Sequence, residues 1–141
     1  MKIITILFMI VMLGSMSASQ AQNKAKTTTS AAKIEILYFH ATNRCPTCLA
    51  VENNAKKTID ENFKTEVTNG IVKFVSLNID DKANKPLVDK YEVAFSTLLI
   101  IKKTGGKEIK TDFTDIGFQC ARNNPVKYAE LLKAELKKNL M

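Results

Sequence analysis

Two cysteines separated by two residues, in the stretch Arg44-Cys45-Pro46-Thr47-Cys48, carry the clearest chemical signal in the chain. Proline favours the first turn of a helix and keeps the residue before it out of helical geometry, so Cys45 is predicted to cap a helix that begins at Pro46. A sulfur at that position faces unpaired backbone N–H groups and the positive end of the helix dipole. Both favour thiolate over thiol, as does the adjacent Arg44. Cys48 follows one turn later on the same helical face, within reach of a disulfide.

This asymmetry matches the division of labour in thiol–disulfide exchange. An exposed sulfur of low pKa attacks, and a shielded sulfur resolves the mixed disulfide. Cys48 is expected to be the shielded one because it belongs to the apolar stripe of the predicted helix. Two alternatives remain open: the same spacing occurs in half of a zinc site, and an inert disulfide that closes one helical turn would stabilise the fold little.

The elements that position the motif follow from the hydrophobic pattern around it. Residues 34–39 are rich in β-branched and aromatic side chains and apolar on both faces, which predicts a central buried strand. A helix is predicted from Pro46 to about residue 63. The other predicted elements are strands over 71–79, 97–102 and 107–113, a short helix over 84–91, and a last helix that Asn124 caps. Two parallel strands joined by a helix, with a hairpin added, make a small α/β sheet covered on both faces.

The first 33 residues are predicted to lie outside this fold. Met1-Lys2 gives a positive start, residues 3–13 are apolar apart from one threonine, and small residues at Ser19 and Ala21 suit a signal peptidase. Because the apolar run is too short to span a bilayer, residues 1–21 are predicted to be a cleaved secretory signal, which makes the protein periplasmic or secreted. A retained N-terminal anchor is the alternative. Residues 22–33 are polar and predict a flexible tether.

Composition narrows the class of partner. The chain has 45% hydrophobic and 25% charged residues, which is the balance of an ordinary globular protein. Its formal net charge is +7, but the lysines and arginines do not cluster with aromatic residues. Nucleic acid is therefore not a predicted partner, and no membrane span is expected after cleavage of the signal.

Several short stretches outside the cysteine motif resemble the thioredoxin-like superfamily. They are Leu77-Asn78-Ile79-Asp80, Tyr91-Glu92-Val93, residues 97–100 and Gly105-Gly106-Lys107. The resemblance implies a thioredoxin-like domain over residues 34–141, a four-stranded mixed sheet with helices on both faces. It also implies a thiol–disulfide oxidoreductase that needs no cofactor, with Cys45 as nucleophile and Cys48 as resolving cysteine, and with protein thiols or disulfides and a redox partner as its partners. Residues 38–48 further resemble the bacterial ArsF-type nitrophenyl-compound nitroreductase subunits, so a non-catalytic reductase subunit is another alternative.

The chain departs from the superfamily pattern near the motif. Ser96 stands where thioredoxins place a cis-proline, and a cis bond before a non-proline residue costs roughly 3 kcal/mol, so a trans bond is expected here. Tyr38 takes the place of the buried acidic residue of the first strand. The chain has no tryptophan before the motif, and its single histidine, His40, stands nearby. A loop histidine more often supports a site than binds a ligand.

The third cysteine, Cys120, allows a second function. The resemblance places Gly117 at the end of the fourth strand beside the active-site loop, which would bring Cys120 towards Cys45. Three thiolates from Cys45, Cys48 and Cys120, with His40 nearby, suit a soft ion such as Cu(I), Zn(II) or trivalent arsenic. The other interpretation is a reduced cysteine with no role. The leading prediction contains no metal.

Overall fold

The computed structural model describes residues 33–141, which form one sheet with helices packed against it. The elements are β1 (Ile34–His40), α1 (Pro46–Asn62), α2 (Lys64–Thr68), β2 (Val72–Asn78), the 3₁₀ helix η1 (Lys82–Asn84), α3 (Lys85–Tyr91), β3 (Thr97–Thr104), β4 (Lys107–Asp112), α4 (Thr114–Cys120) and α5 (Pro125–Leu140). The predicted signal (1–21) and all of the predicted tether except Lys33 lie outside the described residues.

The four strands form one mixed sheet in the order β2-β1-β3-β4. β1 pairs parallel with β2 and antiparallel with β3, so it is the central strand that its doubly apolar sequence predicts. β3 and β4 form an antiparallel hairpin. Its turn needs two left-handed residues, and Gly105 and Gly106 supply them with φ values of 55° and 76°.

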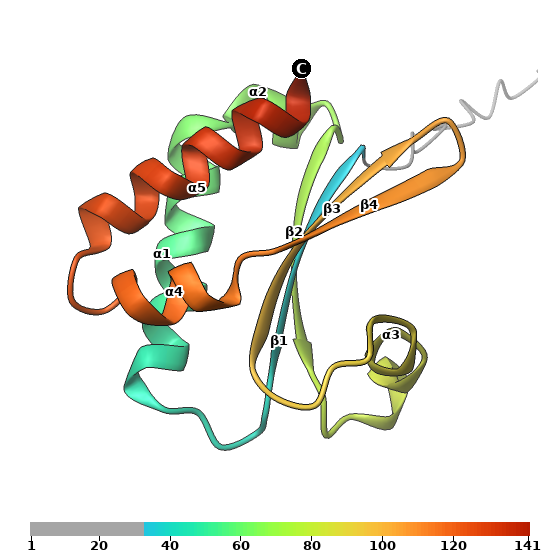
Figure 1. Ribbon diagram of the computed structural model, residues 1–141, viewed down its shortest axis with the longest axis vertical. Coiled ribbons are helices and arrows are strands. Elements are labelled where there is room, and N and C mark those ends of the chain that lie inside the picture. The colour runs from blue at the N-terminus through green and yellow to red at the C-terminus, as the bar shows by residue number, and fades with distance from the viewer. Residues whose placement is uncertain (1–32) are drawn as a thin grey trace, which may run out of the picture.

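Helices cover both faces of the sheet, α1, α4 and α5 on one side and α3 on the other (Figure 1). Successive β1 side chains point to opposite faces, so the strand contributes to two apolar clusters. Ile36 and Tyr38 pack into the larger cluster with α1 and α5, whereas Leu37 and Phe39 pack into the smaller one with Tyr91 of α3. This arrangement confirms the expected α/β, thioredoxin-like fold.

The stripe predicted for the first helix is buried along its whole length. Its members are Cys48, Val51, Ala55, Ile59 and Phe63. Their burial fixes α1 against the sheet, and the N-terminus of α1 therefore stands at the end of β1. The loop from β1 to α1 lies at this end of the sheet (Figure 1).

The prediction was wrong after the fourth strand. β4 ends at Asp112, and Gly117 lies inside α4 rather than at a strand end. The Asp112 carboxylate accepts a hydrogen bond from the Thr114 N–H at 2.9 Å, which helps the chain to turn into the helix. A β-carbon on Gly117 would lie 3.4 Å from Val51 Cγ1, so a side chain larger than a methyl group would not fit between α4 and α1 without a shift. The short helix α2 was also not predicted.

Within residues 33–141, no helix has the length and apolar character needed to cross a membrane.

Candidate redox site

Cys45 is the N-cap of α1, as predicted. Its backbone is extended, with φ −75° and ψ 158°, and Pro46 is the first helical residue. The Cys45 Sγ accepts a hydrogen bond from the Cys48 N–H at 3.0 Å, and the Cys45 carbonyl accepts the first intrahelical bond from Leu49 N–H. The sulfur therefore receives a backbone donor at the positive end of the helix, which is the environment that lowers a thiol pKa.

Cys45 and Cys48 are joined by a disulfide, with their Cα atoms 5.0 Å apart. The two sulfurs differ in access, because Cys45 is exposed whereas Cys48 is only 8% exposed and belongs to the buried face of α1. An incoming thiolate therefore reaches Cys45 more readily than Cys48. This is the predicted asymmetry.

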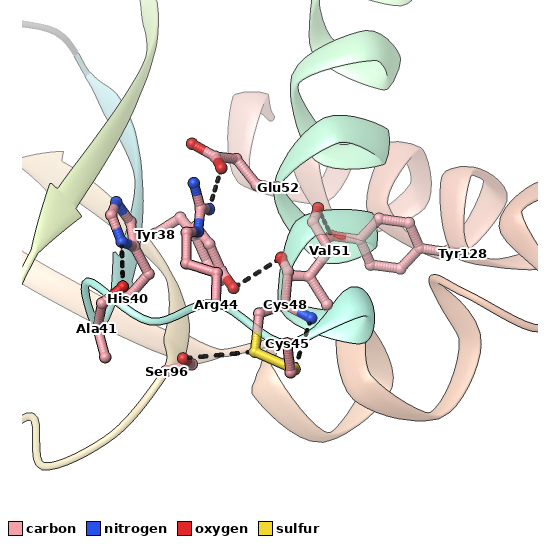
Figure 2. A network of polar contacts seen from close by, with 10 residues as sticks. All are labelled: Tyr38, His40, Ala41, Arg44, Cys45, Cys48, Val51, Glu52, Ser96 and Tyr128. Atoms are coloured by element: carbon pink, nitrogen blue, oxygen red, sulfur yellow. Dashed lines mark hydrogen bonds and ion pairs between the residues drawn. A yellow bond between two sulfur atoms is a disulfide. The ribbon is translucent and has the colours of Figure 1, made fainter.

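Arg44 does not direct its charge at Cys45. Its guanidinium forms an ion pair with Glu52, one and a half turns into α1, and lies 5.8 Å from the centroid of the Tyr38 ring. Figure 2 shows the side chain running towards Glu52 and away from the disulfide. The Arg44 and Glu52 side chains are only 21% and 16% exposed, and their charges are paired. The Glu52 carboxylate therefore compensates the positive charge of Arg44 that was expected to stabilise a Cys45 thiolate.

Glu52 is held ionised by its neighbours. Burial opposes its ionisation, but hydrogen bonds from Ser76 and Arg44 together with the Arg44 charge outweigh burial and lower its pKa below the ordinary value. Arg44 Nε–H is buried without a hydrogen-bond partner within the described chain. Glu52 thus carries most of the compensation for the Arg44 charge.

Tyr38 lies directly behind the cysteine pair. Its side chain is fully buried, and its hydroxyl donates a hydrogen bond to the Cys48 carbonyl at 2.8 Å (Figure 2). Burial raises the Tyr38 pKa, although a hydrogen bond and the charge of Arg44 oppose the rise. Tyr38 is therefore a neutral donor that holds the first turn of α1, and not a base that substitutes for the missing acidic residue.

The loop between β1 and α1 is tied to the neighbouring loop after β2. The Asp80 carboxylate accepts a hydrogen bond from the Thr42 N–H at 2.7 Å, which lowers the pKa of Asp80. Asn78 donates to the Thr42 hydroxyl at 3.0 Å. His40, at the end of β1, has Nδ1 2.9 Å from the Ala41 carbonyl and its ring 6.0 Å from that of Tyr38. The contacts of His40 are therefore with its own loop and with the Tyr38 ring.

Ser96 contacts the sulfur of Cys48 from the segment that leads into β3. It stands immediately before β3, the peptide bond that precedes it is trans as expected, and its hydroxyl donates to Cys48 Sγ at 3.9 Å (Figure 2). Cys48 thus has the Ser96 hydroxyl at its sulfur and the Tyr38 hydroxyl at its carbonyl.

The third cysteine, Cys120, lies on a different helix from Cys45 and Cys48 and is not part of their disulfide. It is a free, half-buried cysteine at the last position of α4, packed against the larger apolar cluster. Among residues 33–141, no group of three or more His, Cys, Asp or Glu side chains is placed to hold a metal ion. In this disulfide form, residues 33–141 therefore do not present the shared site of Cys45, Cys48 and Cys120 considered from the sequence, which stays an alternative for the reduced protein. Cys120 lies at the end of α4, where the sequence had predicted the region just after a fourth strand.

The sequence analysis missed two residues of the site, Glu52 and Asp80. Glu52 could have been found, because it lies four residues after Cys48 on the same predicted helical face. Asp80 could not have been singled out among the exposed acidic residues, since its role depends on the approach of two loops that are 38 residues apart in the chain.

No known protein-family profile matches the chain, and no curated protein sequence matches it. Among solved structures, it is similar to one described as the structure of a malarial protein, with 18% identity and a TM-score of 0.45 over 77% of this chain and 99% of that one. It is also similar to a chloroplastic thioredoxin z, with 21% identity and a TM-score of 0.42 over 72% of this chain and 80% of that one.

Proposed function

We propose that the chain is a thiol–disulfide oxidoreductase that acts on protein substrates. The observation that carries this proposal is the placement of the Cys45–Cys48 disulfide at the first turn of α1, with an exposed capping sulfur and a shielded partner. An inert staple has no need of this difference in access between its two sulfurs.

In the reducing direction, the Cys45 thiolate attacks one sulfur of a substrate disulfide. The substrate S–S bond breaks, one substrate thiolate leaves, and Cys45 forms a mixed disulfide. The Cys48 thiolate then attacks Cys45 Sγ, which breaks the mixed disulfide and releases the second substrate thiolate. The substrate gains two electrons, and the Cys45–Cys48 pair is oxidised. The reverse sequence oxidises a substrate dithiol.

The residues around the pair support this cycle by position. Pro46 fixes the start of α1, and in the disulfide form the amide of Cys48 donates to Cys45 Sγ. Arg44 and Glu52 pair over Tyr38 and hold the loop that presents Cys45. His40 stays a supporting residue in this proposal.

A reductase assay tests the proposal. With dithiothreitol as electron donor, wild-type protein is expected to accelerate insulin reduction, and Cys45→Ser is expected to lose the acceleration completely. Cys120→Ser is the matched control, since it removes a thiol outside the pair, and it should retain activity within about twofold, a change of roughly 0.4 kcal/mol in barrier. Full activity in Cys45→Ser would rule out the exchange mechanism.

We also propose that the protein is exported. The support is the sequence of residues 1–21 alone, with its positive start, apolar run and small residues at Ser19 and Ala21. Mass spectrometry of protein recovered from the producing cells is expected to find Gln22 at the N-terminus. Intact Met1 on cytoplasmic material would contradict export.

The narrower resemblance of residues 38–48 to ArsF-type reductase subunits stays a prediction, and inactivity of wild type in the insulin assay would favour that non-catalytic alternative.

A further inference from the structure

We infer that Ser96 stabilises the Cys48 sulfur by hydrogen bonding and so sets how readily the disulfide opens. The inference rests on the proposed function and assigns a positioning residue to the same site. The contact that supports it lies between the Ser96 hydroxyl, in the segment before β3, and Cys48 Sγ, with an Oγ–Sγ distance of 3.9 Å (Figure 2).

The position of Ser96 is fixed from both directions along the chain. The next residue, Thr97, pairs with Phe39 in the central strand, and the Thr97 hydroxyl donates to the Phe95 carbonyl at 2.9 Å. Cys48 is fixed in turn by the helix and by Tyr38, whose hydroxyl donates to the Cys48 carbonyl. The hydroxyl and the sulfur therefore meet as parts of two anchored segments. A proline at position 96 would bring no hydrogen-bond donor to this sulfur.

The donor matters most when the disulfide opens. An external thiolate attacks the exposed Cys45 Sγ, the Cys45–Cys48 bond breaks, and its electron pair leaves on Cys48 Sγ as a thiolate. That charge develops at a sulfur that is only 8% exposed, so water solvates it poorly. The Ser96 O–H is in place to donate to the developing thiolate, and hydrogen bonds to charged groups are stronger than those to neutral ones. The attacking thiol ends in a mixed disulfide with Cys45.

Four other ionisable side chains lie around Cys48 and are present in every variant at positions 96 and 97. Tyr38 and His40 lie on β1, and Arg44 and Glu52 lie on or just before α1. Of these, Tyr38 also shares a side-chain hydrogen bond with Ser96, whereas Arg44, Glu52 and His40 are not among the groups that Ser96 contacts through a hydrogen bond in residues 33–141. Tyr38→Phe removes the Tyr38 hydroxyl and leaves Ser96 in place, so a change in the Cys48 pKa that Ser96→Ala still produces in a Tyr38→Phe background is assigned to the Ser96–Cys48 contact.

The test measures the pKa of Cys48 itself in the full chain. In a Cys45→Ser, Cys120→Ser background, Cys48 is the only thiol, and its thiolate is titrated by ultraviolet absorbance. Ser96→Ala is expected to raise the Cys48 pKa by about one unit. With the native pair restored, the same substitution is expected to slow opening of the disulfide by dithiothreitol by roughly threefold to tenfold, because a leaving thiol of higher pKa departs more slowly.

Two variants separate hydrogen bonding from general disturbance of the loop. Ser96→Thr keeps a hydroxyl and should keep the Cys48 pKa near that of the parent protein. Thr97→Val removes the neighbouring hydroxyl, which bonds to Phe95 and not to the sulfur, and should leave the Cys48 pKa unchanged. An unchanged Cys48 pKa in Ser96→Ala, or an equal shift in Thr97→Val, would overturn the inference. Failure of the proposed function would appear separately, as loss of insulin reduction in wild type.

Discussion

The Arg44–Glu52 ion pair beside the disulfide gives the sharpest prediction about stability. Replacing Glu52 with Gln keeps the shape of the side chain but removes the charge that compensates Arg44. Exposed ion pairs are worth about 0.2–1 kcal/mol, whereas removing one partner of a fully buried pair costs about 3–5 kcal/mol. The side chains of Arg44 and Glu52 are 21% and 16% exposed, so the pair lies between these two limits. We expect Glu52→Gln to lower the free energy of unfolding by about 1–2 kcal/mol.

The same helix contains a matched control. Lys56 and Asp60 form an ion pair on the outer face of α1, with side chains 61% and 52% exposed. Asp60→Asn therefore removes the carboxylate of a solvent-exposed ion pair on the same helix. It is expected to lower the free energy of unfolding by no more than about 0.5 kcal/mol. Urea denaturation of the oxidised proteins at neutral pH gives both values.

The pH dependence of the difference follows from the direction of the Glu52 pKa shift. The folded protein holds the pKa of Glu52 below its ordinary value, so the ionised carboxylate stabilises the fold at pH values above the unfolded pKa. This contribution is lost as the pH falls through the folded pKa. The stability gap between wild type and Glu52→Gln should thus be largest near neutral pH and should shrink in acid. A gap no larger than that of Asp60→Asn, or one that grows in acid, would refute the reasoning.

Three further predictions follow from single contacts. Tyr38→Phe and Tyr128→Phe each remove a buried hydroxyl that donates to an α1 carbonyl, and each should lower the free energy of unfolding by about 1 kcal/mol. Because only Tyr38 bonds to the Cys48 carbonyl, only Tyr38→Phe should change the alkylation rate of reduced Cys48. Equal alkylation rates in the two variants would contradict this prediction. Gly117→Leu should cost about 1–3 kcal/mol in thermal or urea denaturation because α4 would be pushed from α1, while Gly117→Ala, whose β-carbon just reaches contact with Val51, should be tolerated. Cys120→Ser should bind arsenite with the same affinity as reduced wild type in a calorimetric titration, and a loss of affinity by orders of magnitude would restore the three-thiolate alternative.

Much of the fold could be predicted because its signals are local. The apolar stripe of α1, the doubly apolar β1 and the Asn124–Pro125 start of α5 each report their own element through periodicity or capping. The N-cap role of Cys45 is local as well, since Pro46 imposes it. The sequence therefore located the pair that forms the disulfide and the difference in burial between its two cysteines.

The errors arose where the outcome depends on tertiary contact. The segment after β4 has a weak helical signal, and in the structure it forms α4, which packs against α1 where Gly117 meets Val51. The charge of Arg44 was expected at Cys45 because the two are adjacent in sequence. In the structure a longer-range partner, Glu52, takes that charge. Side-chain direction of this kind is set by burial and by competing partners, which a linear sequence does not display.

The most direct test of the central claim is to identify the sulfur that carries a trapped substrate. Reduced Cys48→Ser, Cys120→Ser protein contains Cys45 as its only thiol and cannot resolve a mixed disulfide. Mixed with insulin and analysed under non-reducing conditions by mass spectrometry, it is expected to accumulate a disulfide-linked adduct on Cys45 that dithiothreitol releases. The companion Cys45→Ser, Cys120→Ser protein, which retains the shielded Cys48, should form little adduct in the same time. Absence of an adduct on Cys45, or equally rapid adduct formation on Cys48, would contradict the assignment of Cys45 as the attacking residue.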